Sequence, residues 1–334
     1  MAKRMKSKIQ PAPLRMTFSA TVDADADESY YIDLSQCASL INRRFYRQGL
    51  NWAVAGFKMV ARSSTGSNPL FARVGIHSLP HTWVMFNAWE KTFRTFMKQQ
   101  KEASAQSQSI RPKYLDFKVY MHPEHAKSTN MLPLDSTGNS PNAIQDQWQY
   151  SKIVIPEYGS TGQAYEFSPV VTGATNFGQS VLSMIEGYAA SRALPQEEDP
   201  NMPKDASTDE NWLLAMFNDG TKQNQEVVDN LLTEQIKPPY PLEGDGTHTD
   251  TQYPGGANNF SGLEIVDEAL ISPGTIGLPI NVNFKGGTFP CGLIELRVNN
   301  FSTGTGSSNI DFDFYVDLVP GTHRGYLAEP MTEM

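Results

Sequence analysis

The chain has 334 residues, with 27 Lys and Arg against 36 Asp and Glu, a formal net charge of −9. A chain of this length buries enough surface to fold without disulfides or a structural metal. Its two cysteines, Cys37 and Cys291, form no CxxC pair and suggest neither a disulfide framework nor a zinc cluster. No stretch of 18 apolar residues occurs, so no membrane partner is expected. Taken as a whole, the acidic balance argues against nucleic acid.

The distribution of charge along the chain reverses that reading. Residues 1–150 carry 19 Lys and Arg against 11 Asp and Glu, a net charge of +8, whereas 151–334 carry 8 against 25, a net charge of −17. Such asymmetry indicates a nucleic-acid or membrane face. The pattern predicts a basic arm over residues 1–15, although a solubilising tail would have the same composition. Its basic residues are Lys3, Arg4, Lys6, Lys8 and Arg15, and no acid lies among them.

After the arm, the first half of the chain mixes strands with helices. Strands are predicted from period-two alternation of apolar residues, and helices from apolar residues that repeat every three or four positions. In chain order the elements are a strand over 16–22, a helix capped by Asp33, strands over 52–62 and 71–77, and a helix over 83–101. The first helix is expected to end in a basic cluster formed by Arg43, Arg44 and Arg47, ahead of Gly49. These arginines either complement the helix dipole or widen the basic surface of the arm.

The rest of the chain is richer in strands. They are predicted over 115–121, 147–155, 164–171, 280–284, 292–298 and 310–318, with helices over 177–192 and 227–232. Nine short strands with irregular connections predict an all-β protein, a sandwich or a barrel. We therefore expect one β domain over 16–320 and a C-terminal tail over 321–334.

Two groups of side chains are candidate metal sites. His122, Glu124 and His125 offer zinc ligands, but Pro123 disfavours a helix there and no further protein ligand is apparent nearby, so a polar loop after the strand over 115–121 is favoured. Asp311, Asp313 and Asp317 share one face of a predicted strand and could hold Ca²⁺, but a solvated strand face is favoured there. No catalytic motif emerges, so we expect neither an enzyme nor a cofactor.

Several patches of the sequence form a recognisable series. They are YYIDLSQC at 30–37, NRRFYRQG at 42–49, PHTWV at 80–84 with NAW at 87–89, and GYA at 187–189 with SR at 191–192. Together they resemble the capsid proteins of circular, Rep-encoding single-stranded DNA viruses (CRESS-DNA viruses, circovirus-like). The resemblance is recognisable in pieces across residues 1–240, and the last third matches in general character.

The resemblance implies a single eight-stranded jelly roll that self-assembles into an icosahedral shell, most simply of 60 copies (T=1), around a circular single-stranded DNA genome. It implies that the basic arm faces the lumen and binds DNA without sequence preference, with the acidic half facing mainly outward. It places the protein in the virion and allows for the host nucleus during assembly; the host-cell receptor is unknown. The DNA-binding residues are then Lys3, Arg4, Lys6, Lys8, Arg15, Arg43, Arg44 and Arg47.

The sequence departs from that family in the shortness of the arm. Sixty copies would bring roughly 300 arm charges, whereas a genome that encodes this chain needs about 1000 nucleotides, so the arms would neutralise under about a third of the phosphates. Other groups on the body must supply the rest. A lectin-like or receptor-binding β-sandwich, such as a viral spike, is the alternative; it explains the polar loops but not the basic arm.

Overall fold

The structure is a computed structural model of the whole chain. The residues described are 12–64, 71–105, 116–135, 137–139, 148–155, 165–192, 262–271, 278–301 and 308–333. Several predicted features lie outside them. These are the arm residues Lys3, Arg4, Lys6 and Lys8 and the helix predicted over 227–232.

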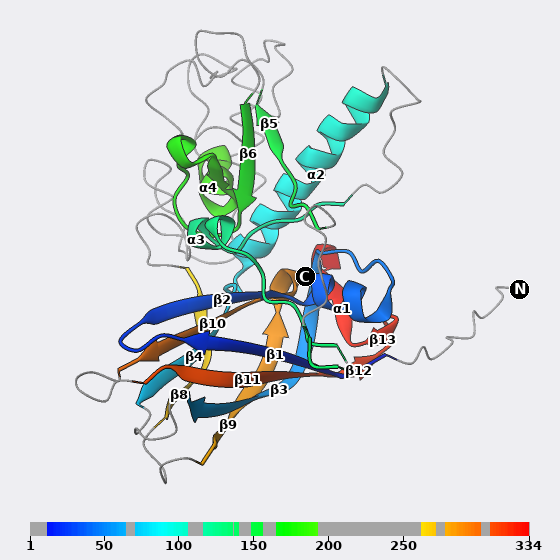
Figure 1. The fold of residues 1–334 in the computed structure, drawn as a ribbon. Helices are drawn as coiled ribbons and strands as arrows, with labels where there is room; N and C mark the ends of the chain where they lie inside the picture. The colour runs from blue at the N-terminus through cyan, green and yellow to red at the C-terminus, as the bar shows by residue number, and fades with distance from the viewer. Residues whose placement is uncertain are drawn as a thin grey trace, which may run out of the picture. The chain divides into compact units, whose positions relative to one another are not determined.

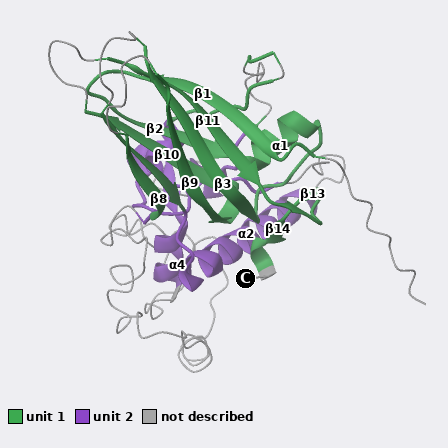
Figure 2. Ribbon diagram, turned by 90° about the horizontal axis from the view of Figure 1, so that it is seen from below, with its two compact units in different colours: residues 1–78, 128–148, 264–333 green, residues 79–127, 149–263, 334 purple. Residues whose placement is uncertain are grey.

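The chain forms two compact units, drawn in green and purple in Figure 2. Unit 1 comprises residues 1–78, 128–148 and 264–333, and unit 2 comprises 79–127, 149–263 and 334. Unit 2 is therefore inserted in the sequence of unit 1, mainly between its fourth and fifth long strands. The β domain predicted over 16–320 is thus divided between the two units, and unit 1 also includes residues 321–333 of the predicted C-terminal tail.

Unit 1 is an antiparallel β-sandwich, as the sequence predicted (Figure 1). The strands of its first sheet lie in the order β1-β11-β3-β14, and β9 pairs with β3; those of the second lie in the order β2-β10-β4-β8. The first sheet contains β1 (Arg15–Val22), β3 (Leu50–Ser63), β9 (Ile280–Phe289), β11 (Ile310–Leu318) and β14 (Ala328–Pro330). The second contains β2 (Asp27–Asp33), β4 (Ala72–Ser78), β8 (Glu264–Ile271) and β10 (Leu293–Asn300).

The eight long strands pair in a nested way. The first strand in the chain, β1, pairs with the last, β11, and β2 pairs with β10. Further in, β3 pairs with β9 and β4 with β8. All four pairs are antiparallel, so the chain behaves as one long antiparallel ribbon that is rolled into two sheets.

Aromatic rings fill the space between the two sheets. The Phe57 ring stacks on Phe314 at a centroid distance of 5.6 Å and meets Phe289 edge-on at 5.5 Å. Trp52 is fully buried and lies 5.4 Å from the ring of Tyr326. Such pairs add to the free energy gained by burial. Because successive side chains of a strand point to opposite faces and one face packs on this core, β11 alternates strictly between buried and half-buried residues.

Several short elements complete unit 1. The helix α1 (Leu34–Asn42) follows β2, and the segment after residue 128 runs along the edges of both sheets. There the Met131 amide donates to the Tyr31 carbonyl and the Leu134 amide to the Thr17 carbonyl, both at 2.7 Å. The remaining pieces are the pair β12 (Pro320–Gly321) and β13 (Gly325–Tyr326), and the 3₁₀ turns η5 (Pro290–Gly292) and η6 (Met331–Glu333).

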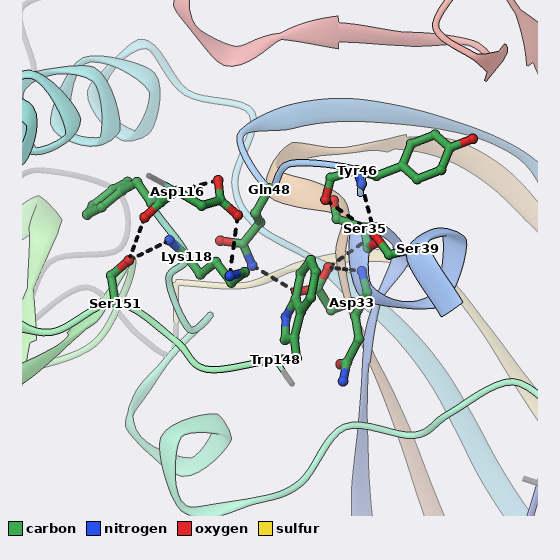
Figure 3. A network of polar contacts seen from close by, with 11 residues as sticks. Asp33, Ser35, Ser39, Tyr46, Gln48, Asp116, Lys118, Trp148 and Ser151 are labelled. Atoms are coloured by element: carbon green, nitrogen blue, oxygen red, sulfur yellow. Dashed lines mark hydrogen bonds and ion pairs between the residues drawn. The ribbon is translucent and has the colours of Figure 1, made fainter. Parts of the chain in front are cut away.

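Unit 2 contains a long helix, α2 (Trp83–Ala105), as predicted from its aromatic stripe. Trp89 stacks on Phe93 at 5.0 Å, and Phe96 lies 5.1 Å from Phe117. Lys118 donates its amide to Ser151 Oγ at 2.9 Å and forms an ion pair with Asp116 at 3.4 Å (Figure 3). The other elements are α3 (Pro123–Lys127), β5 (Ile153–Ile155), β6 (Tyr165–Val170), η2 (Phe177–Gln179), β7 (Val181–Ser183) and α4 (Met184–Arg192).

The structure corrects the prediction at three places in unit 2. The helix predicted over 177–192 begins at Met184, because Ser180 adopts a left-handed φ of 56° and a short strand follows it. The strand predicted over 147–155 is reduced to β5. In the described part of 115–121, burial alternates as predicted, yet only Tyr120 forms a bridge, with Val170.

Three strands of the sandwich were not predicted: β2, β8 and the short β14, which lies in the predicted C-terminal tail and pairs with β3. The last three residues of β2 are all buried, so period two is lost there. Along β8, the register with β4 shifts between Ile76 and His77, and this irregularity breaks the alternation that marks a strand in sequence.

A glycine of β9 is required by close approach of the backbone. A Cβ on Gly286 would lie 2.1 Å from the Val54 carbonyl oxygen and 2.4 Å from the Ala55 carbonyl carbon. Gly286→Ala is therefore expected to lower the free energy of unfolding by about 2–3 kcal/mol, measured by urea denaturation. Gly287→Ala is the matched control, since its Cβ would meet only Val266 at 3.6 Å. Equal stability of the two variants would contradict the prediction.

Candidate nucleic-acid interface

The point where the basic arm joins the body is defined by Tyr326. Its hydroxyl donates to the Pro13 carbonyl at 2.9 Å and accepts from the side chain of Asn42, the last residue of α1, at 2.9 Å. Burial raises the pKa of Tyr326, which keeps this hydroxyl protonated as a donor. The chain that leads from the arm is thus held beside the C-terminal end of α1.

The predicted arginine cluster lies at that same end of α1. Arg43 ends the helix in a left-handed conformation with φ 52°, and Arg43, Arg44 and Arg47 are all exposed. The Arg47 guanidinium lies 5.9 Å from the ring centroid of Phe45. The last turn of α1 contains no basic residue, so the arginines lie beyond it rather than along it. Arg43 is the C-cap residue itself, where a positive charge still complements the helix dipole, so this position is consistent with both roles.

A fourth arginine joins the cluster from the far end of the sequence. Arg324 Nη1 donates to the Phe45 carbonyl at 2.6 Å, and its guanidinium lies 5.8 Å from the Tyr46 ring. Burial raises the pKa of Tyr46, while the positive charges of Arg44 and Arg324 act in the opposite direction. We call Arg43, Arg44, Arg47 and Arg324 the arm-exit cluster. Sequence reasoning missed Arg324 because 277 residues separate it from Arg47.

Arg15 lies apart from that cluster, on β1. It forms two short hydrogen bonds with Asp317 on β11, 2.6 Å from Nε and 2.8 Å from Nη2. Its side chain remains 59% exposed, so the guanidinium keeps an open side. Arg15 therefore belongs to the outer face of the first sheet, two residues beyond the anchored Pro13.

The loop that carries the arginines is held by a buried carboxylate. Asp33 caps α1, as predicted: its Oδ1 accepts from the amides of Ser35 at 2.9 Å and Gln36 at 3.2 Å (Figure 3). Its Oδ2 accepts from the side chains of Gln48 at 3.0 Å and Trp148 at 3.1 Å. Burial raises the pKa of Asp33 to about 6, although these four hydrogen bonds act to lower it.

The histidines weighed as zinc ligands have structural partners. His125 is fully buried in α3, where its Nδ1 accepts from the Met121 amide at 3.1 Å. His122 Nδ1 accepts from the Glu124 amide at 3.3 Å. Pro123 occupies the first position of α3, where a proline is tolerated, so the motif forms a short helix rather than a loop. No three potential metal-binding side chains converge anywhere in the described residues.

The three aspartates weighed as Ca²⁺ ligands are distributed among different partners. Asp317 pairs with Arg15, and Asp313 Oδ2 accepts from Arg62 Nη2 at 2.8 Å. Asp311 Oδ1 accepts from the Thr21 hydroxyl at 2.7 Å. They therefore form a polar strand face, the interpretation favoured from the sequence.

Comparison of the chain with protein-family models, with curated proteins and with solved structures found no match. Among the described helices, none combines the length and the apolar character required to cross a bilayer.

Proposed function

We propose that this chain is a capsid protein that self-assembles into an icosahedral shell and packages circular single-stranded DNA. The observation that carries the proposal is the nested pairing of eight strands, joined to a basic arm that leaves the sandwich beside the arm-exit cluster. The resemblance in sequence to CRESS-DNA virus capsid proteins agrees with both features.

The strand order supports an eight-stranded jelly roll. In such a fold a single antiparallel ribbon rolls up, so that the first strand pairs with the last and each inner pair follows in turn. The pairs β1–β11, β2–β10, β3–β9 and β4–β8 follow this rule without exception. Viral capsid and lectin domains both use this architecture, so the fold alone leaves the alternative of a receptor-binding module.

The charges favour the capsid over that alternative. A carbohydrate- or receptor-binding sandwich has no need of a basic arm, whereas a shell around DNA must neutralise phosphates at high density. Four arginines gather where the arm joins the body, although they come from residues 43–47 and 324. The basic residues of the arm precede Pro13, which is anchored beside this cluster, so the arm and the cluster both offer positive charge to a polyanion.

Electron microscopy of the purified protein tests the proposal. We expect uniform hollow particles, most simply of 60 copies, and nuclease-protected single-stranded DNA in particles from cells that contain it. Light scattering over a salt series gives a second measure of assembly. Discrete monomers or trimers at every salt concentration would overturn the proposal and favour the receptor-binding alternative.

A further inference from the structure

The outer face of the first sheet carries charged side chains in addition to those of the arm and the arm-exit cluster. Side chains alternate along each strand, so every second residue points away from the core. Figure 2 shows β1, β11 and β3 side by side, in agreement with the pairing. The outward residues are Arg15, Thr17, Ser19 and Thr21 of β1; Asp311, Asp313, Tyr315 and Asp317 of β11; Lys58, Val60 and Arg62 of β3; and Asn281, Asn283 and Lys285 of β9.

The acids of this face are all engaged, while two of its cations are not. Asp317 and Asp313 pair with arginines and Asp311 accepts from a threonine. Lys58 and Lys285 form no ion pair with any described residue, and Lys285 is exposed. On this face β3 and β9 carry Lys58, Arg62 and Lys285 and no acid, whereas β1 and β11 carry Arg15 and three aspartates, a net charge of −2. The net positive charge of the face is therefore confined to its β3–β9 half.

An aromatic ring lies beside these cations. Tyr315 pairs with Lys58 across β11 and β3, and Lys58 pairs with Asn283 on β9. The ring of Tyr315 is half-buried, and the guanidinium of Arg15 lies 5.7 Å from its centroid. A cationic strip with an accessible aromatic ring is the combination that binds single strands without sequence preference, through phosphate contacts and base stacking.

This face is continuous with the arm. Arg15 is the first residue of β1, and Pro13 just before it is anchored to Tyr326. Arg15 in turn lies against the Tyr315 ring, so the described chain after the arm leads directly onto this face. The arm alone neutralises under about a third of the phosphates of a genome long enough to encode this chain, so a second cationic surface is needed.

We propose that the outer face of the first sheet is a second binding surface for single-stranded nucleic acid, on which Lys58 and Lys285 contact phosphates and Tyr315 stacks on a base. The proposal rests on the packaging function proposed above. It names the part of the body that binds the genome in addition to the arm.

Binding of a fluorescent oligothymidylate to the full chain, over a salt series and below the concentration of assembly, tests the surface. Each lost phosphate contact lowers the slope of log affinity against log salt by about 0.7 for a single strand, so Lys58→Gln with Lys285→Gln should lower it by about 1.4. Tyr315→Leu should weaken binding roughly tenfold with little change of slope, and Tyr315→Phe should restore it.

The matched control is Lys98→Gln with Lys127→Gln, which removes two exposed lysines of unit 2 that have acidic neighbours. A slope for the Lys58 and Lys285 variant equal to that of this control would overturn the surface. Microscopy of the same variants separates the two proposals. If the Lys58 and Lys285 variant forms shells but its salt slope is unchanged, only the binding surface is rejected. If the slope is lowered but no shells form, only the capsid function is rejected.

Discussion

Asp33→Ala is expected to lower the free energy of unfolding at pH 7 by about 3 kcal/mol. Loss of a helix N-cap costs about 1 kcal/mol, and each buried donor left without an acceptor costs about 1–3 kcal/mol. Asp33 accepts from two amides of α1 and from Gln48 and Trp148, so the substitution affects the helix and the loop that carries Arg43 to Arg47. Urea denaturation measures the loss.

Asp313→Ala is the control for this substitution. Asp313 forms an exposed ion pair with Arg62, and such pairs contribute about 0–1 kcal/mol. A loss for Asp33→Ala no larger than for Asp313→Ala would contradict the role of Asp33 as the centre of the network.

The pH dependence gives an independent check on Asp33. Its pKa is raised from 3.8 to about 6, so the folded protein binds this proton more tightly than the unfolded chain. Stability from this group is therefore fully present below pH 3.8 and is lost as the pH rises through 6. Relative to Asp33→Asn, which does not titrate, the wild-type protein should gain about 2 kcal/mol between pH 7 and pH 4. If the free energies of unfolding of the wild-type protein and of Asp33→Asn changed in parallel with pH, Asp33 would not titrate in this range.

Removal of the arm is expected to produce the largest change in function. Deletion of residues 1–11 removes Lys3, Arg4, Lys6 and Lys8. Four lost phosphate contacts should lower the salt slope by about 3 and weaken binding at 0.1 M salt several hundredfold. Particles should still form, because the nested strand pairs lie outside the deleted segment. Oligonucleotide binding and the ratio of absorbance at 260 and 280 nm in particles measure the two effects.

A full-length variant with the four basic residues replaced by glutamine distinguishes charge from length. It should match the deletion in its salt slope and in nucleic-acid content. Shells that retain their full nucleic-acid content after either change would refute the electrostatic role of the arm. Loss of shells in the deletion but not in the glutamine variant would instead assign the arm a role in assembly.

Local patterns predicted the parts of the chain in which one face is buried and the other solvated. Alternation along β11 predicted its strand, and Asp33 ahead of an apolar stripe predicted the start of α1. Both signals depend on residues a few positions apart. They fail in β2, where both faces become buried, and in β8, where a change of register interrupts the period.

Only part of the charge distribution on the folded protein could be predicted from the sequence. The asymmetry between the halves and the cluster at residues 43–47 are properties of the linear chain. The contribution of Arg324 to that cluster depends on hydrogen bonds between segments that are far apart in sequence. Lys58, Lys285 and Tyr315 share a face only because β3, β9 and β11 pair in a particular register.

The sequence by itself determined the all-β character, the cap of α1 and the division of a net charge of −9 into a basic and an acidic half. These follow from local propensity, from hydrophobic periodicity and from composition. Only the tertiary structure decided the nested strand order and the separation of unit 2. It also decided which cations on the outer face of the first sheet form no ion pair with a described residue. Strand pairing and charge pairing both join residues hundreds of positions apart, and no pattern within a short window specifies such partners.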